Sequence, residues 1–546
     1  MRALRIVRTL VATLLAPRAI WQSVLVVSVA LAYMWHFVNV SVDDVFISFR
    51  YADNLAQGRG LVFNEGERVE GFSNFLWTVL LSVASFCGAS QFQFGLLVVA
   101  KLFGAICATA TLYVLFDLGQ QVSGRRGAWL GPALVATSAP FVFWSIAGLE
   151  TPLLIFCECL ALNLHFREQN GRRLCVPSSL FWLLAALTRP EPVVLFGVCV
   201  LDRWIEQVRA RRWNLGNETV FLSWFVLPYL GLLGLRLGYY GEWVPNTYYA
   251  KMHMSPRVWI KGWLYVKYGI NVLGWAYCVP IMMTGLFLGG RFGKRVRLVL
   301  ALTVVRLVIV MREGGDWMPA LRFLTPVVPM FGILAHAALV GWLGVAARRL
   351  APQSSWPGWV IDPSWVAVWR RRIEGPEVRR VLRPVRWLGA SILVGALTLA
   401  NVRGVRSVNL AWFPSGYGGV WLDPYSHFEL ARIMRDELKL TGTVATGEAG
   451  VIPYYSGLRL LDLNALMDKH LARQPGAMHL KHDLDYVFAR RPDSIVLLGK
   501  RNDSGRVVST TDYATRIGND PRTNEHYELV REHEDQLLLY VRREGH

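Results

Sequence analysis

The chain has 546 residues, of which 53% are hydrophobic, 12% are aromatic and only 18% are charged. This composition excludes an ordinary soluble domain, in which roughly 25% of the residues are charged. The formal net charge of +19 would suit a nucleic-acid binder, but the basic residues cluster in short segments between long apolar runs. That distribution is typical of the cytoplasmic loops of a membrane protein, so we predict an all-α polytopic membrane protein.

The N-terminal segment is basic and then apolar from about residue 19 to residue 40. The apolar stretch is too long for the h-region of a signal peptide and lacks a small-residue cleavage pattern before Asp43. We therefore expect an uncleaved first span with the N-terminus in the cytoplasm.

The first outer loop is predicted over residues 41–94. Its first part, residues 41–72, holds six carboxylates and three arginines, which places it outside. Apolar residues recur at helical spacing after Asp44, so we expect an interfacial helix over residues 44–57, begun by a capping box of Ser41 and Asp44. Counting the next apolar run as a span would put the basic segment 119–127 outside. Residues 73–94 are therefore predicted to form a second interfacial helix.

The second span is predicted at 95–116. Further apolar runs predict spans near residues 128–147, 151–166, 176–187, 193–206, 217–238, 271–289, 296–311, 321–346 and 387–404, which makes eleven spans in all. The runs on either side of "TRPEP" (188–192) are shorter than the roughly 20 residues that a span needs. We expect them to be incomplete helices that meet in an outer cavity lined by protein.

The loop at 347–386 carries nine arginines against three carboxylates and is predicted to be cytoplasmic. One more span then completes a transmembrane domain over residues 1–405 and delivers residues 406–546 to the outer side. A helical pattern in "SHFELARIMRDELK" and β-like runs in "GTVAT", "SIVLL" and "QLLLYVR" predict a small α/β domain there.

Two adjacent carboxylates, Asp43 and Asp44, stand where the first span reaches the outer surface. One of them can cap a helix and face its positive end, but this leaves the other unexplained. Alternatively, one is a general base that takes a proton from a hydroxyl, while its neighbour holds a cation or a donor hydrogen bond. The spacing alone leaves both alternatives open.

Four more polar motifs fall in predicted outer loops: "GLET" (148–151), "TRPEP" (188–192), "VPNTYYAKMH" (244–253) and "REGGDWMPALRF" (312–323). Their cations suit a lipid-linked phosphate that enters from the bilayer edge, although each can also be an ordinary snorkelling cation. Their polar residues can equally be turn or interface residues. Arg306 lies inside an apolar run, and we expect it to form a structural ion pair within the bundle.

These motifs carry a resemblance to a known family. "DDVFISFRYADNLAQGRGLVFNEGERVEGFSNFLWT", "GLETPL", "TRPEP", "PNTYYAK", "GGDWMPALRFLTPVVP" and "GEAGVIPYYSG" resemble the bacterial GT-C glycosyltransferases related to the terminal arabinofuranosyltransferases of mycobacterial cell-wall arabinan. The resemblance runs from about Val42 to Arg473. It implies the GT-C fold, with a pair of interfacial helices in the first outer loop, in the bacterial cytoplasmic membrane.

The resemblance also implies an activity. Such enzymes take a sugar, here arabinofuranose or another sugar, from a polyprenyl-phosphate carrier and pass it with inversion to a cell-envelope glycan or glycoconjugate on the outer face. Family members carry a catalytic aspartate in the first outer loop, which maps onto Asp43 and Asp44. No nucleotide-binding pattern occurs in the chain, which agrees with a lipid-linked donor.

We assign Asp43 as the base and Asp44 as its support or as the ligand of a divalent cation, which stays an alternative. The donor phosphate is assigned to Lys251, Arg322 and Arg189. The remaining polar residues of the motifs are assigned to the donor-sugar pocket: Glu150, Asn246, Tyr248, Asp316 and His253.

Two other classes of function compete with the transferase. A transporter or flippase of lipid-linked sugar would place ionisable residues near the bilayer midplane and often shows repeated halves. Here the polar motifs lie at the outer ends of the spans, and we find no repeat. A non-catalytic scaffold whose C-terminal domain binds cell-wall polymer would leave the aspartates dispensable.

Overall fold

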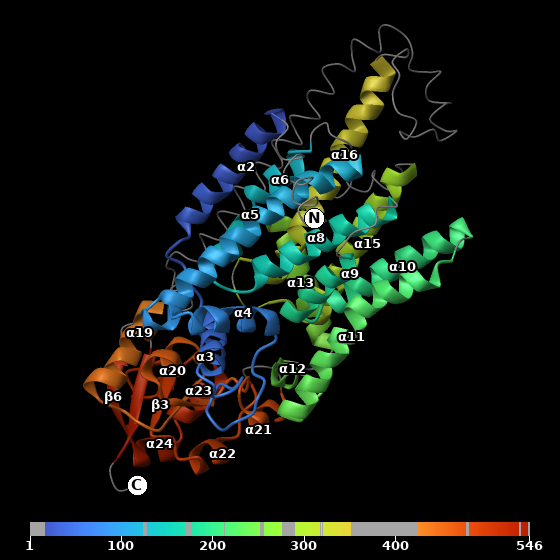
Figure 1. Ribbon diagram of the computed structural model, residues 1–546. Helices are drawn as coiled ribbons and strands as arrows, with labels where there is room; N and C mark the ends of the chain where they lie inside the picture. Colours follow the sequence, from blue (N-terminus) through green and yellow to red (C-terminus); the bar gives the residue numbers. More distant parts are fainter. Residues whose placement is uncertain are drawn as a thin grey trace.

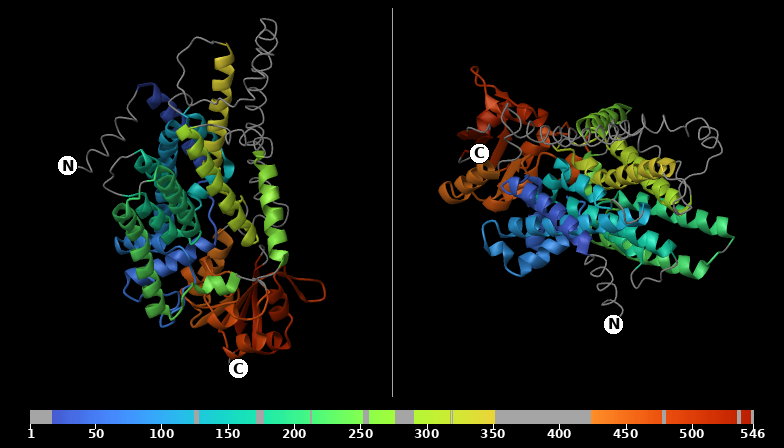
Figure 2. Two further views of the ribbon diagram at one scale, coloured as in Figure 1. Left: turned by 90° about the vertical axis from the view of Figure 1, so that its right-hand side faces the viewer. Right: turned by 90° about the horizontal axis from the view of Figure 1, so that it is seen from above.

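The computed structural model of the protein describes residues 17–123, 128–170, 177–211, 213–251, 256–275, 290–316, 318, 320–350, 424–476, 480–533 and 537–543. They form a bundle of helices and a small C-terminal domain at one end of it (Figures 1 and 2). The helices of the bundle are α2 (Pro17–His36), α5 (Gly95–Ser123), α6 (Leu130–Ala136), α7 (Ala139–Ile146), α8 (Thr151–Gln169), α9 (Ser178–Thr188), α10 (Pro192–Ala210), α11 (Leu215–Tyr240), α12 (Asn246–Lys251), α13 (Pro256–Val272), α15 (Gly290–Arg312), the short 3₁₀ turn η4 (Arg322–Leu324) and α16 (Val327–Leu350).

Each span that we predicted within the described residues coincides with a helix or a pair of helices. The run at 128–147 is divided at Thr137 into α6 and α7, and the runs beside "TRPEP" form α9 and the longer α10. The span predicted at 387–404 and most of the one at 271–289 fall outside the described residues. No span was predicted for the residues of α13.

Length and composition test how many of these helices can cross a membrane. Within the described ranges, α5 and α11 are each long and apolar enough to do so. The helices α7 and α8, which meet at an angle of 116°, would add a third span if the bent pair is counted as one. The total of eleven spans stays a prediction.

The first outer loop contains the two helices that we predicted there. They are α3 (Asp44–Ala56) and α4 (Phe75–Phe86), and the 3₁₀ turn η1 (Ala89–Gln91) follows α4. Gly58, with a φ of 75°, follows the last turn of α3 and ends the helix. Both helices pack beside each other at the end of the bundle that faces the C-terminal domain (Figure 1).

The predicted capping box of Ser41 and Asp44 is wrong. The residue before α3 is Asp43, whose side chain does not cap the helix, and the hydroxyl of Ser41 is buried without a partner among the described residues. The first turn is closed instead by the backbone, because Val45 N donates to Val42 O at 3.2 Å and Phe46 N donates to Asp43 O at 3.0 Å. The carboxylates are therefore free for other contacts.

The C-terminal domain is built on a five-stranded sheet of order β2-β1-β3-β7-β6, in which β1 is parallel to β2 and β3, and β7 is antiparallel to β3 and β6. Short helices cover it (Figure 1). Its elements are α19 (Pro424–Arg432), the π turn η5 (Ile433–Glu437), β1 (Thr443–Thr446), α20 (Val451–Ser456), β2 (Arg459–Asp462), α21 (Lys469–Ala472), α22 (Leu484–Ala489), β3 (Ser494–Leu498), β4 (Lys500–Arg501), β5 (Val507–Val508), α23 (Asp512–Gly518), α24 (Pro521–His526), β6 (Tyr527–His533) and β7 (Leu537–Arg542).

The first outer loop and the C-terminal domain share a hydrophobic core. Tyr51 and Phe72 from the loop pack with Leu460 and Met467 from the domain, and all four are buried. A side chain on Gly71 would collide with the sulfur-bearing end of Met467, so the two segments are in van der Waals contact. The domain is thus fixed on the loop that carries the paired aspartates.

A buried ion pair fixes the same loop to the bundle. Arg236 of α11 donates from Nε to Glu70 Oε2 at 2.6 Å and from Nη2 to Glu70 Oε1 at 3.0 Å. Arg236 is 8% exposed and Glu70 is 4% exposed. A paired geometry of this kind offsets the cost of burying both charges, whereas either charge alone would be uncompensated.

We therefore expect Glu70→Ala to lower the thermal unfolding temperature of the purified protein in detergent, since it leaves Arg236 buried without its partner at a cost of about 3–5 kcal/mol. Glu70→Ala combined with Arg236→Leu should recover much of the loss. Glu437→Ala, which breaks the exposed pair of Glu437 and Arg432, is the control and should have little effect. Equal shifts for the two single variants would contradict this account.

Candidate active site

Asp43 lies directly before α3, but its carboxylate is bound to the C-terminal domain. Its two oxygens accept hydrogen bonds from the backbone N–H groups of Gly450 and Val451, each at 2.8 Å. These N–H groups open α20 and have no acceptor within that helix, so Asp43 caps α20 and faces its positive end. Burial, followed by the nearby carboxylate of Glu448, raises the pKa of Asp43 to about 6.

Gly450 allows this close approach. A side chain there would collide with the main-chain carbonyl of Asp43 and with its carboxyl carbon. Only glycine can bring its backbone so near to another chain segment without displacing it. The capping contact therefore depends on both residues.

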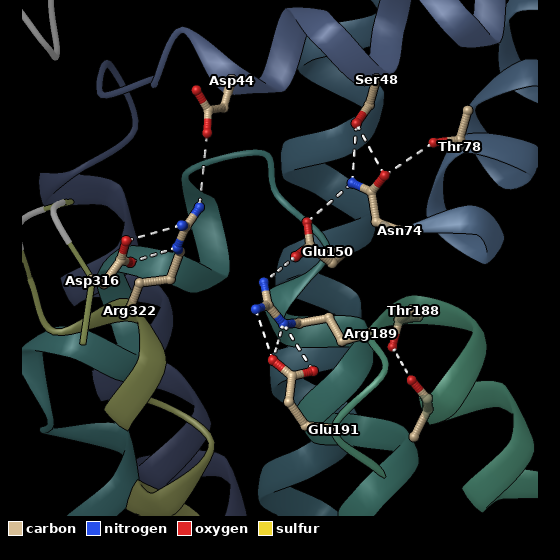
Figure 3. A network of polar contacts seen from close by, with 11 residues as sticks. Asp44, Ser48, Asn74, Thr78, Glu150, Thr188, Arg189, Glu191, Asp316 and Arg322 are labelled. Carbon is tan, nitrogen blue, oxygen red and sulfur yellow. Dashed lines mark hydrogen bonds and ion pairs between the residues drawn. The ribbon is translucent and has the colours of Figure 1, made fainter. Parts of the chain in front are cut away.

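Asp44 occupies the first turn of α3, and its carboxylate points toward Arg322 (Figure 3). The side chain is 28% exposed, and its Oδ2 lies 4.0 Å from Nη1 of Arg322. Within the described residues, no group donates a hydrogen bond to this carboxylate. Burial raises the pKa of Asp44, while the positive charges of Arg322 and Lys251 act in the opposite direction. The carboxylate of Asp43, which we had assigned as the base, is thus bound by α20, whereas that of Asp44 is not.

Arg322 is held in place by Asp316. Its Nε and Nη2 donate to the two oxygens of Asp316 at 2.7 and 3.0 Å, and both side chains are almost fully buried. Asp316 follows a tight turn at Gly314 and Gly315, whose φ angles are 80° and 77°. The bidentate contact fixes the guanidinium with Nη1 toward Asp44 (Figure 3). Asp316 thus supports Arg322, whereas we had assigned it to the sugar pocket.

Glu150 and Arg189 belong to a second network beside this pair (Figure 3). Arg189 donates from Nη2 to Glu191 at 2.8 Å and from Nη1 to Glu150 at 3.2 Å. Glu150 also accepts from Asn74 at 3.1 Å. Burial alone would raise the pKa of Glu150, but Arg189 and then Arg322 outweigh it and lower that pKa. The guanidinium of Arg189 is therefore already engaged by two carboxylates.

Lys251, at the end of α12, is an exposed cation whose charge acts on Asp44 and Arg322. In the part of the chain that the structure describes, its ammonium group forms no hydrogen bond or ion pair. Tyr248 of the same helix is 43% exposed. His253, which we also assigned to the site, lies outside the described residues.

Asn246 contacts the C-terminal domain. It is 3% exposed, and its side-chain nitrogen donates to the carbonyl oxygens of Ala465, Leu466 and Asp468 at 3.1, 2.9 and 3.2 Å. The amide is directed into the C-terminal domain and joins α12 to it. These contacts give Asn246 a structural role, and its assignment to the sugar pocket stays a prediction.

Two titratable residues near the aspartates, Glu448 and His427, were not predicted from the sequence. Glu448 is buried, its Oε2 lies 3.3 Å from Nε2 of His427, and its charge acts on Asp43 and Asp44. Both residues follow the aspartates by more than 380 positions. The signal was "GEAG" (447–450), in which a carboxylate stands among small residues directly before a short helix.

The prediction for Arg306 is confirmed. Within the bundle it forms an ion pair with Glu158 of α8, and both side chains are buried. A charge at such a depth is stable because its partner is buried with it. Arg306 is thus a structural residue of the bundle.

The chain is similar to known proteins over most of its length. It is 26% identical over 536 residues to the terminal beta-(1->2)-arabinofuranosyltransferase of Mycobacterium tuberculosis, with 84% of this chain and 81% of that protein covered. It is 28% identical over 359 residues to the protein of the same name in Corynebacterium glutamicum, a match that spans 56% of this chain and half of that protein.

The fold and the C-terminal domain have matches of their own. The crystal structure of ArnT from Cupriavidus metallidurans bound to undecaprenyl phosphate superimposes with a TM-score of 0.57 at 14% identity, covering 96% of this chain and 98% of that chain. Residues 421–543 match a family model described as a domain of unknown function, DUF8728. From the relatives and the fold together, the chain is a membrane-embedded GT-C glycosyltransferase related to the mycobacterial terminal arabinofuranosyltransferases.

Proposed function

We propose that this enzyme transfers arabinofuranose from a polyprenyl-phosphate carrier to a hydroxyl of a cell-envelope glycan, and that Asp44 is the base. The names of its relatives support the sugar, and the lipid bound to the ArnT structure supports the carrier. The charge pattern of the loops supports an orientation with the N-terminus in the cytoplasm and the C-terminal domain outside.

One observation carries the assignment of the base. Each oxygen of Asp43 accepts a backbone hydrogen bond from α20, whereas the carboxylate of Asp44 is 28% exposed and lies 4.0 Å from Nη1 of Arg322. A general base must be within hydrogen-bond reach of the hydroxyl that it deprotonates. The carboxylate of Asp44 accepts no hydrogen bond from the described residues, so it is free to accept one from an acceptor hydroxyl.

The chemistry follows from this arrangement. The acceptor hydroxyl oxygen attacks the anomeric carbon while its proton passes to Asp44. The bond between that carbon and the phosphate oxygen breaks on the opposite face, which inverts the configuration. Negative charge then develops on the departing lipid phosphate, and the ammonium of Lys251 with Nη1 of Arg322 stabilises it. Asp316 keeps Arg322 in position for this contact.

A divalent cation does not fit the groups around Asp44. The positive charges of Arg322 and Lys251 already act electrostatically on this carboxylate. They would repel a metal cation, which has the same sign of charge. Within the described ranges there is also no group of three or more acidic, histidine or cysteine side chains that could hold a metal ion. The proposed transfer therefore uses protein groups alone.

We expect Asp44→Asn to lower kcat by about 10²- to 10⁴-fold, because the variant retains the shape of the side chain but removes the base. The measurement is transfer of radiolabelled arabinofuranose from a polyprenyl-phosphate carrier to an arabinan oligosaccharide. Full transfer by this variant would overturn the assignment. Carrier translocation into vesicles without any transfer by the wild type would favour a flippase, and binding of polymer alone would favour a scaffold.

Asp43→Asn should act mainly on stability. An amide presents one nitrogen donor to the two N–H donors of α20, so the unfolding temperature should fall while part of the transfer activity remains. Gly450→Ala should cause the same loss of stability, since its methyl group collides with Asp43. Complete loss of transfer in Asp43→Asn with an unchanged unfolding temperature would instead identify Asp43 as the base.

Lys251→Met should raise the KM for the lipid-linked donor by roughly 10- to 100-fold, as expected when a hydrogen bond to a charged group is lost. The kcat at saturating donor should change less, because Arg322 still contacts the phosphate. Lys261→Met removes an exposed lysine of α13 and is the matched control. An unchanged donor KM in Lys251→Met would contradict the phosphate assignment.

The activity should decline in acid. The base acts only when ionised, and burial raises the pKa of Asp44, so the acidic limb of kcat/KM should lie above the value of about 3.9 for an ordinary aspartate. Removing the opposing positive charge with Lys251→Met should move that limb to higher pH. A shift to lower pH in this variant would contradict the proposed electrostatics.

A further inference from the structure

A cleft separate from the Asp44 site lies between the first outer loop and the C-terminal domain. Its volume is about 1000 Å³. The last turns of α3 and the η1 turn form one wall, and α19, η5 and α20 form the other. In Figure 1 these elements lie side by side at the end of the bundle that carries the domain. The cleft is thus on the same side of the bundle as Asp44.

Aromatic rings line part of the cleft. Phe428 and Tyr455 contact each other edge to face, with ring centroids 4.7 Å apart, and both are only partly buried. Phe92 is 72% exposed at the rim. Exposed rings of this kind offer flat apolar surfaces with a polar surrounding, which suits the apolar C–H faces of sugar rings.

Hydrogen-bond donors line the rest of the cleft. Arg432, Arg435 and Arg459 each leave about half of the side chain exposed, at 51%, 49% and 48%, and each also pairs with a neighbouring carboxylate: Glu437, Asp436 and Glu67. Gln57 and Gln91 add exposed amides. Guanidinium groups donate several hydrogen bonds from a fixed plane, and amides both donate and accept. The lining therefore matches a ligand rich in hydroxyl groups.

Hydrogen bonds between the two walls of the cleft hold them together. Tyr454 donates to Asp53 of α3 at 2.8 Å, and Tyr455 donates to the carbonyl of Gln93 at 2.6 Å. Arg50 of α3 donates to the carbonyl oxygens of Pro453 and Leu458, at the far end of α20 from the cap at Asp43. The cleft is therefore formed before any ligand binds, which lowers the entropic cost of binding.

From this lining we propose that the cleft binds the glycan chain of the acceptor, several sugar units away from the hydroxyl that reacts. The inference rests on the proposed transferase function and adds a subsite to it. Asp53 follows Asp44 by nine residues of the same helix, so the cleft and the base are separated by about 13 Å. A monosaccharide acceptor cannot occupy both places, whereas an oligosaccharide can.

The test compares a short and a long acceptor with the full-length protein in detergent. Wild type should use a long arabinan oligosaccharide with a KM at least 10-fold below that of a monosaccharide acceptor. Phe92→Ala combined with Arg432→Ala should remove most of that difference, while kcat/KM for the monosaccharide stays unchanged. Phe86→Ala combined with Arg531→Ala removes an aromatic ring and an arginine that are similarly exposed but lie outside the cleft, and it should retain the difference.

The outcomes separate this inference from the proposed function. If the wild type transfers the sugar, and the cleft variant and the control both keep the lower KM for the long acceptor, the subsite proposal is overturned. A loss confined to liposomes that contain anionic lipid would also overturn it and would assign the arginines to the membrane surface. No transfer by wild type to either acceptor would contradict the proposed function itself.

Discussion

The contact between Asp43 and the first turn of α20 determines how the site is assembled. Through it, a carboxylate at the exit of the first helix holds a domain that follows about 400 residues later. Gly450 makes the approach possible, and the buried core that Tyr51 shares with Met467 extends the same interface. Because Asp43 is engaged in this way, the next residue, Asp44, is directed away from the domain and toward Arg322.

We thus infer that Asp43 binds the C-terminal domain and that Asp44 is the base, two roles that the sequence could not assign. Both are buried enough for their pKa values to be raised, but their partners differ. Backbone N–H groups hold Asp43, whereas Asp44 faces the buried guanidinium of Arg322, which Asp316 fixes in place. Two backbone hydrogen bonds fix the orientation of the Asp43 carboxylate and stabilise its ionised form, which weakens it as a base, so we infer that local geometry decides between the two residues.

Periodicity and loop charge predicted the starts of α3 and α4 within two residues, because each helix has a continuous apolar face. The end of the second helix was predicted at residue 94, but α4 ends at Phe86 and the turn η1 follows it. They also identified the outer motifs that meet around Asp44. They could not predict that Asp316 holds Arg322, that Arg189 is engaged by Glu191 and Glu150, or that Asn246 joins α12 to the C-terminal domain. Such pairings depend on how distant segments pack, and a polar residue in a loop motif gives no indication of its partner.

The most direct test of this account is a structure of the enzyme with a non-hydrolysable phosphonate analogue of the polyprenyl-phosphate donor. We predict that the phosphonate oxygens contact Lys251 and Nη1 of Arg322, that Asp44 faces the anomeric carbon, and that Asp43 stays bound to Gly450 and Val451. A complex in which the carboxylate of Asp43 has left α20 and faces the sugar would contradict it.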